Sequence, residues 1–129
     1  MAKVYAYPKL IEFNEGIAPE TAVVISDTTL GCNVVLNGAD DKGNVYSVKD
    51  ESLLLVLENT NTSVEKVTIK AGTAWAGVAN KEIEIPASGK SLLRLEGAKY
   101  KHVSGEDKGC VVIVPATASK IKVTAYNFK

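Results

Sequence analysis

Hydrophobic and polar positions alternate with a period of two over most of the chain from Glu51 onward. This period places successive side chains on opposite faces of a strand, and the segments are rich in valine, isoleucine, leucine and threonine, as strands are. They stop at glycine, asparagine or proline, which are typical of turns. The predicted strands cover residues 52–57, 66–70, 81–85, 92–95, 110–114 and 120–126. Short strands at this spacing predict an all-β fold, either an antiparallel β-sandwich or a small β-barrel.

Two segments depart from simple alternation. Residues 52–57 are almost continuously apolar, which predicts a central strand covered on both faces. Residues 96–99 are the one place where a short helical turn is expected.

The first fifty residues have a less regular pattern, in which the apolar pieces 22–25 and 34–36 are separated by turn clusters. Residues 1–20 are predicted to form an N-terminal arm, because the part from Lys3 to Phe13 looks extended and carries a proline and three aromatics, Tyr5, Tyr7 and Phe13. Such an arm is expected to dock as an edge strand. The arm and the strands together form one domain, residues 1–129, since a chain of this length builds a single core.

The charge balance argues against two classes of partner. The chain has 15 basic and 15 acidic residues, so no overall field attracts nucleic acid or an anionic membrane. No stretch approaches the roughly 20 apolar residues of a membrane helix, and the N-terminus lacks the apolar core of a signal peptide. We therefore expect a protein that stays inside the cell that makes it and binds neither nucleic acid nor membrane.

The chain carries no recognisable catalytic or metal-binding motif. His102 is the only histidine, and it is expected at the surface or on an edge strand. No nucleophile elbow, zinc-protease motif, phosphate-binding loop or dinucleotide fingerprint occurs, so we expect no enzyme, no catalytic residue and no cofactor.

Oxygen-bearing side chains cluster within residues 37–44, but their spacing does not match a calcium loop. A solvated turn without metal is expected there, and residues 106–109 are expected to form a polar loop tip. The oxygen-bearing residues of the first cluster are Asn37, Asp40, Asp41 and Asn44.

Cys32 and Cys110 are too few and too far apart for a disulfide framework or a metal motif. They are expected to be reduced thiols packed as small hydrophobic groups. A single disulfide bond between them remains an alternative if their Cα atoms lie close together in an oxidising environment.

Trp75 lies in a loop of small and apolar residues, 72–79, which is unusual for a solvated connection. Its ring either closes one end of the core or anchors a partner. With Tyr5, Tyr7 and Phe13 it completes the set of candidate partner-binding residues.

Four sequence pieces, in their order, resemble the head decoration proteins of tailed bacteriophages, which are auxiliary capsid proteins. The resemblance covers roughly residues 51–129 and does not include the first fifty. The Trp75 loop also departs from it, because it lacks the charged and proline-rich residues associated with relatives. The pieces are Leu-Leu-Leu-Val-Leu-Glu-Asn-Thr-Asn at 53–61, Val-Thr-Ile-Lys-Ala-Gly at 67–72, Ile-Glu-Ile-Pro-Ala-Ser-Gly at 83–89 and Leu-Glu-Gly-Ala-Lys-Tyr at 95–100.

The resemblance implies a virion structural protein that binds the outside of an assembled capsid and stabilises it. Its partner would be the major capsid protein, and it would act as a homotrimer on the capsid surface after synthesis in the host cytoplasm. One alternative is a carbohydrate-binding or adhesin-type β-sandwich module, which the tyrosines and Trp75 would serve. A further alternative is an accessory or inhibitor domain of an enzyme, acting by surface complementarity alone.

Overall fold

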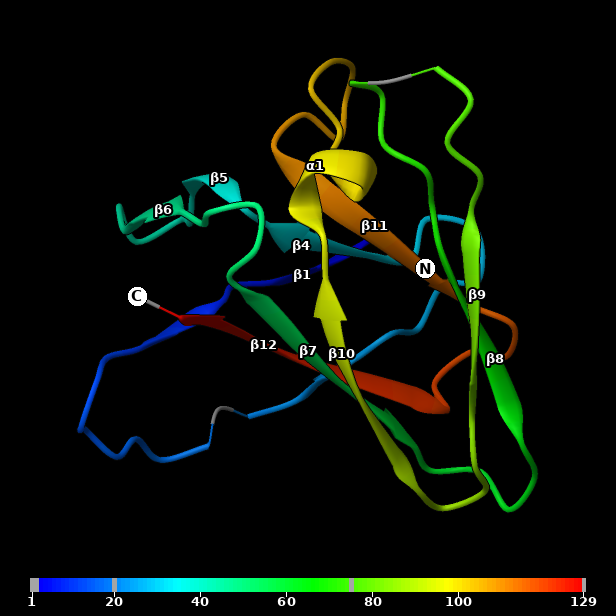
Figure 1. Ribbon diagram of the computed structural model, residues 1–129. Coiled ribbons are helices and arrows are strands. Elements are labelled where there is room, and N and C mark those ends of the chain that lie inside the picture. The colour runs from blue at the N-terminus through cyan, green and yellow to red at the C-terminus, as the bar shows by residue number, and fades with distance from the viewer. Residues whose placement is uncertain (1–2, 20, 75, 129) are drawn as a thin grey trace.

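The structure is a computed structural model that describes residues 3–19, 21–74 and 76–128. These residues are almost entirely in strands and loops, with one short helix (Figure 1). The elements are β1 Val4–Ala6, β2 Lys9–Ile11, β3 Val23–Val24, β4 Cys32–Val35, β5 Asn37–Ala39, β6 Val45–Ser47, β7 Leu53–Asn59, β8 Glu65–Ile69, β9 Lys81–Ile85, β10 Lys90–Leu95, α1 Gly97–Tyr100, β11 Cys110–Pro115 and β12 Ile121–Phe128.

The strands form two main sheets that face each other. One has the order β1-β4-β11-β8-β9 and the other the order β10-β7-β12-β2, with β3 also beside β12, while β5 and β6 form a separate hairpin. The sheets do not close into a barrel, so the predicted all-β fold is confirmed in its sandwich-like form. Most pairs are antiparallel, but β1 runs parallel to β4 and β2 parallel to β12. Both parallel pairs involve the N-terminal segment, which joins each sheet without a hairpin connection.

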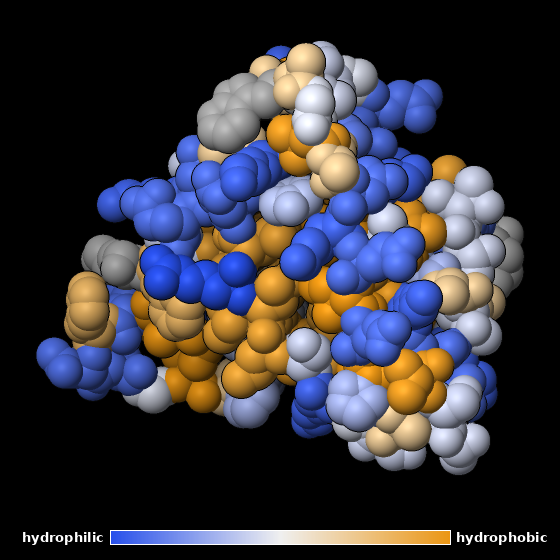
Figure 2. All heavy atoms as spheres, turned by 45° about the vertical axis from the view of Figure 1, so that its right-hand side comes forward, coloured by the Kyte–Doolittle hydropathy of each residue, from blue (hydrophilic) through white to orange (hydrophobic). Residues whose placement is uncertain are grey.

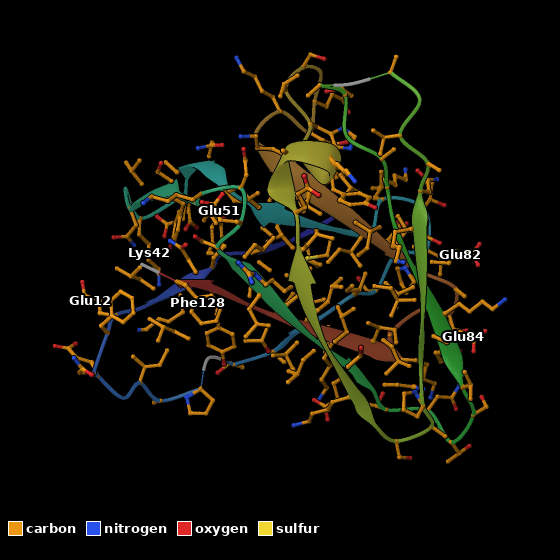
Figure 3. All side chains as sticks on the ribbon, in the orientation of Figure 1. Glu12, Lys42, Glu51, Glu82, Glu84 and Phe128 are labelled. Carbon is orange, nitrogen blue, oxygen red and sulfur yellow. The ribbon has the colours of Figure 1, made fainter. Side chains whose placement is uncertain are left out.

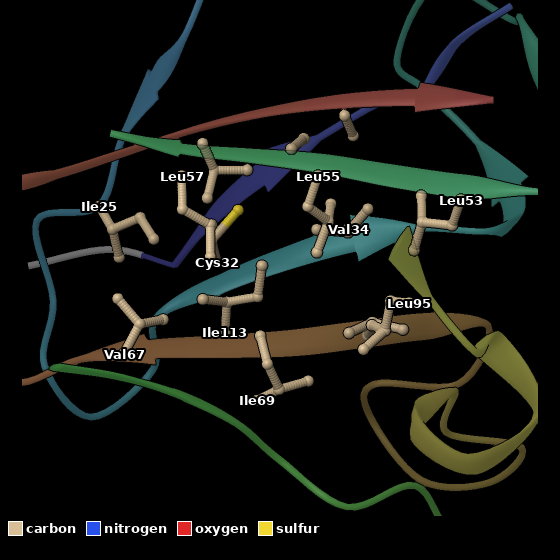
Figure 4. Close-up of a cluster of buried hydrophobic side chains, with 14 of the residues drawn as sticks. Ile25, Cys32, Val34, Leu53, Leu55, Leu57, Val67, Ile69, Leu95 and Ile113 are labelled. Carbon is tan, nitrogen blue, oxygen red and sulfur yellow. The ribbon is translucent and has the colours of Figure 1, made fainter. Parts of the chain in front are cut away.

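The core lies between the inward faces of the two sheets (Figure 4). Leu53, Leu55 and Leu57 of β7 are fully buried, because residues two apart in a strand share one face. They face a layer of apolar side chains from β4, β8 and β11. The alternate residues Leu54 and Val56 are only partly buried. The prediction that this strand is covered on both faces is therefore wrong, since no further layer among the described residues buries its outer face.

The strands and the helical turn predicted in the C-terminal two thirds are confirmed to within a few residues as β7 to β12 and α1. Strand register follows the turns between them. In the β9–β10 connection, for example, Gly89 donates its N–H to the carbonyl of Pro86, and Asn59 Nδ2 donates to the carbonyls of Ile85 and Pro86. The buried Asn59 amide thus ties the end of β7 to this turn.

The N-terminal segment contributes to both sheets. β1 lies at the edge of the first sheet, and the chain then crosses at Tyr7 and Pro8 to place β2 at the edge of the second. Ala6 is buried in the core, and Val4 packs against it. Residues 4–11 are therefore part of the sandwich.

Replacing Leu55 with alanine should lower the free energy of unfolding by about 2–5 kcal/mol, because it removes a fully buried side chain and leaves a cavity. Leu30→Ala is the matched control, since Leu30 is exposed in a loop and its truncation should cost less than about 1 kcal/mol. Urea unfolding followed by circular dichroism measures both changes, and equal losses would contradict this description of the core.

Candidate functional site

A groove opens between the N-terminal segment, β6 and the second half of β12. It has a volume of about 840 Å³. Its walls are formed by residues 5–10, residues 44–49 and most of residues 123–128, and Thr21 and Val23 complete the lining. Sites for small molecules and peptide side chains commonly span about 300–1,000 Å³, so the groove is large enough for a ligand. We call it the tyrosine groove, after its three stacked rings Tyr5, Tyr7 and Tyr46.

The three rings form one stack. Tyr5 and Tyr7 are two residues apart in an extended segment and so project to the same side, with ring centroids 6.5 Å apart and planes inclined by 17°. Tyr46, from the centre of β6, stacks on Tyr7 at 5.1 Å and 30°. Offset stacking of this kind is favourable between aromatic rings. Tyr5 is the most open of the three, with 48% of its surface exposed.

The β5–β6 hairpin positions Tyr46 through Asp40. Asp40 Oδ1 accepts the backbone N–H groups of Lys42 and Asn44, each at 2.9 Å. Oδ2 accepts Asn44 Nδ2 at 2.9 Å and the Tyr46 hydroxyl at 3.0 Å. The hydrogen bond from the Asn44 side chain is the main cause that lowers the pKa of Asp40 to about 2. The oxygens of Asp40 thus hold the hairpin together, within a turn that is exposed to solvent.

The charges that line the groove are basic. Lys9 and Lys49 both contribute to its wall, and no aspartate or glutamate occurs among the described lining residues. The remaining polar groups are amides and hydroxyls, from Asn44, Ser47 and Thr124 among others. The groove therefore offers aromatic faces, hydrogen-bonding groups and positive charge together.

Exposed apolar side chains surround the groove. Phe13 and Val45 are 80% and 79% exposed, and Leu10 and Phe128 are also exposed. Phe13 and Phe128 line a shallow hollow beside the main groove, at the end of the molecule where Figure 3 labels Phe128. We refer to the tyrosine groove and these surrounding side chains as the groove face. Exposed apolar groups gathered on one side of a protein are typical of interaction surfaces.

The structure brings together three of the four predicted partner-binding residues. Tyr5 and Tyr7 line the groove and Phe13 lies at its margin, whereas Trp75 lies outside the described residues. Sequence reasoning missed Tyr46 and Phe128. A tyrosine in the middle of a short strand after an aspartate turn is a weak signal, because only the fold places β6 beside the N-terminal segment.

The two cysteines are free and buried, so the disulfide alternative is not formed. Cys32 pairs with Ile113 and Cys110 pairs with Val35. Cys32 and Val35 are an odd number of positions apart, so the two thiols point to opposite faces of the sheet. Burial raises the pKa of Cys32 to about 12 and also raises that of Cys110. Both thiols are therefore protonated at neutral pH and are poor nucleophiles.

A polar cluster covers part of the outer face of the first sheet. Asp107 Oδ1 accepts hydrogen bonds from Lys3 Nζ and, at 2.9 Å, from Asn33 Nδ2. The bond to Lys3 is the main cause that lowers the pKa of Asp107, and it raises the pKa of Lys3. Residues 106–109 form the polar turn that was expected, and within it Asp107 also holds Lys3 beside β4. His102, at the base of this loop, is half-buried, so its expected place at the surface is only partly correct.

In the described part of the chain, no three His, Cys, Asp or Glu side chains come close enough to hold a metal ion. The single described helix is too short to cross a membrane.

Comparison of the chain with protein-family models, curated proteins and solved structures finds no match.

Replacing Asp40 with asparagine should destabilise the hairpin in a pH-dependent way. A carboxyl group whose pKa is lowered on folding contributes stability that is present above its unfolded value, 3.8, and is lost as the pH falls through its folded value of about 2. The difference in urea midpoint between the wild type and Asp40→Asn should therefore be largest near neutral pH and shrink below about pH 4. Asp41→Asn, at the next residue, is the control. A difference for Asp40→Asn that does not change with pH would contradict the assigned hydrogen bonds.

Proposed function

We propose that the protein is a virion structural protein that binds the outside of an assembled bacteriophage capsid and stabilises it. The observation that carries the proposal is the groove face, where aromatic and aliphatic side chains are exposed together. Tyrosine is enriched among the residues that dominate binding energy in protein interfaces, especially where a pocket excludes water. The resemblance of residues 53–61, 67–72, 83–89 and 95–100 to head decoration proteins supports the same function.

The resembling pieces and the groove face occupy different parts of the fold. The pieces lie in β7, β8, β9, β10 and α1 and in the turns that follow them, which build the sandwich. The groove face is made by the N-terminal segment, β6 and the end of β12, mostly outside the resemblance. A β-sandwich scaffold with its own recognition surface is what a decoration protein specific for one shell requires.

The balance of charges fits the same role. With equal numbers of acidic and basic residues, the protein has little attraction for packaged DNA and is free to select the major capsid protein by shape and local chemistry. Many copies on one shell would each bridge neighbouring subunits and add their modest affinities.

Replacing Tyr5 or Phe13 with alanine should weaken binding to purified assembled capsids by about tenfold or more, because each change removes an exposed anchor from the groove face. Val64→Ala is the matched control, since Val64 is also exposed but lies in the turn before β8. Co-sedimentation with capsids across a concentration series gives the affinities. Point variants are preferred to a truncation, which would remove β1 and β2 from the sheets.

Wild-type binding that both groove variants retain would exclude the groove face as the docking surface. An absence of wild-type binding to any phage shell tested would count against the decoration function itself. Unchanged circular dichroism and thermal midpoints in the variants show that a loss of binding is not a loss of fold.

A saccharide-binding module is the second candidate, and the tyrosine groove is the observation that favours it. Aromatic faces, amides and hydroxyls recognise sugars, and Lys49 would favour an acidic one. Calorimetric titration with neutral and acidic oligosaccharides tests this candidate. Heat of binding that Tyr5→Ala abolishes would support it, and a flat response across the panel would remove it.

A further inference from the structure

Two unpaired strand edges lie on the same side of the sandwich. β9 ends the first sheet, and β10 ends the second. The two strands are consecutive and are joined by the short turn 86–89, so they run in opposite directions (Figure 1). The outer edge of each strand presents backbone N–H and C=O groups that no other described strand of its sheet pairs with.

The core is open to solvent between these edges. Ile83 of β9 and Leu93 of β10 pack against the core but are only partly buried. Leu92, which points outward from β10, is 72% exposed. Figure 2, which brings this side of the molecule forward, shows hydrophobic side chains gathered in the middle between polar ones. A surface with an apolar centre and a polar rim has the composition of a protein interface.

The charges on the two edges are opposite. Glu82 and Glu84 project outward from β9, away from the core (Figure 3). Within the sheet Glu84 lies opposite Lys66 of β8, and Glu82 lies opposite Thr68. The exposed face at the β9 edge therefore carries two carboxylates.

The outward side chains of β10 are Lys90, Leu92 and Arg94, and all three are exposed. The guanidinium of Arg94 donates through Nε and Nη2 to the carbonyl of Glu51, both at 3.2 Å. This contact orients the side chain without neutralising it, because the acceptor is a backbone carbonyl. Within the sheet Lys90 lies opposite Glu58 of β7, and Arg94 lies opposite Leu54. The outer face of β10 itself therefore carries two basic side chains beside Leu92, of which Arg94 has no acidic residue opposite it.

We propose that a second copy of this chain occupies this side of the molecule in a dimer with twofold symmetry. A half-turn about an axis parallel to the strands exchanges the two layers of the sandwich and keeps each strand direction. β9 of each copy then lies antiparallel to β10 of the other, so that both edges pair at once. Each sheet of one copy then continues into the other sheet of the second copy, and the partly exposed core residues of both copies become buried between them.

One register brings together an apolar pair on the inner face and a charged pair on the outer face, while the stem of Lys81 extends over Leu95 at the end of the strand. Placing Ile83 opposite Leu93 of the second copy closes the core on the inner face. The same register places Glu82 opposite Arg94 of the second copy on the outer face, with Glu84 diagonal to its Lys90. Cross-strand pairs of opposite charge are favourable and like pairs are unfavourable.

The charges also select this pairing over the two other ways of joining the edges. Pairing β9 with β9 would set the two glutamates of one copy against those of the other. Pairing β10 with β10 would set Lys90 and Arg94 against the same residues. Only the pairing of β9 with β10 brings opposite charges together at both edges.

Light scattering over a dilution series, without any capsid, tests the dimer. The wild type should have the mass of two chains at high concentration and dissociate on dilution. A protein that stays monomeric up to about 1 mM would overturn the proposal, and so would a trimer, which the resemblance to decoration proteins implies.

Charge reversal identifies the surface. The variant Glu82→Lys with Glu84→Lys has two basic edges, and the variant Lys90→Glu with Arg94→Glu has two acidic edges. Each alone should have its dimer dissociation constant raised by about tenfold or more, and an equimolar mixture should recover a heterodimer. Reversal of the same numbers of charges at Glu15 and Glu106, or at Lys42 and Lys108, provides controls outside both edges.

Dimers that persist unchanged in both edge variants would refute the proposed surface. A mixture of the edge variants that stays monomeric, while both variants keep their circular dichroism spectra, would refute it as well. Slower hydrogen exchange confined to β9 and β10 at high concentration would support it. The measurements use no capsid, so their failure leaves the proposed decoration function to its own test.

Discussion

The structure depends on the burial of the inward face of each sheet against the other. β7 supplies three fully buried leucines to this layer, and they are matched by the apolar residues of β4, β8 and β11 (Figure 4). Burial of this kind is the main favourable contribution to folding. The outer face of β7 stays partly exposed, whereas β4 and β11 are buried on both faces. The edge strands β9 and β10 are therefore the parts of the sandwich most open to contacts with other molecules.

The N-terminal segment forms one wall of the candidate binding groove on this scaffold. It pairs with β4, crosses between the sheets and then pairs with β12, so Tyr5 and Tyr7 are held at the rim of the sandwich. The Asp107 carboxylate holds Lys3 at one end of the segment, and the Asp40 hairpin brings Tyr46 against Tyr7. The groove is thus supported by hydrogen bonds on both sides, which favours a preorganised binding surface.

The two sides of the sandwich differ in a way that suits two kinds of contact. On the groove side, the N-terminal crossing occupies the gap between the sheets and displays aromatic rings. On the opposite side, the turn between β9 and β10 and the neighbouring turn between β7 and β8 connect the layers, and the outer edges of β9 and β10 remain unpaired in the described residues. The proposed docking surface and the proposed dimer surface are therefore separate faces, so that one contact would not block the other.

The sequence by itself determined the all-β class, the strands from β7 to β12 and the short helical turn, because their period of two and their turn residues are local properties. It also pointed to Tyr5, Tyr7 and Phe13 as candidate partner-binding residues, which the structure places in or beside one groove. Only the tertiary structure decided that β1 pairs in parallel with β4 and β2 with β12. It also decided that Tyr46 stacks on Tyr7 and that Asp107 bonds to Asn33. These features join residues that are far apart in the chain, and the pattern of hydrophobic positions shows which face a residue occupies but not which distant segment it meets.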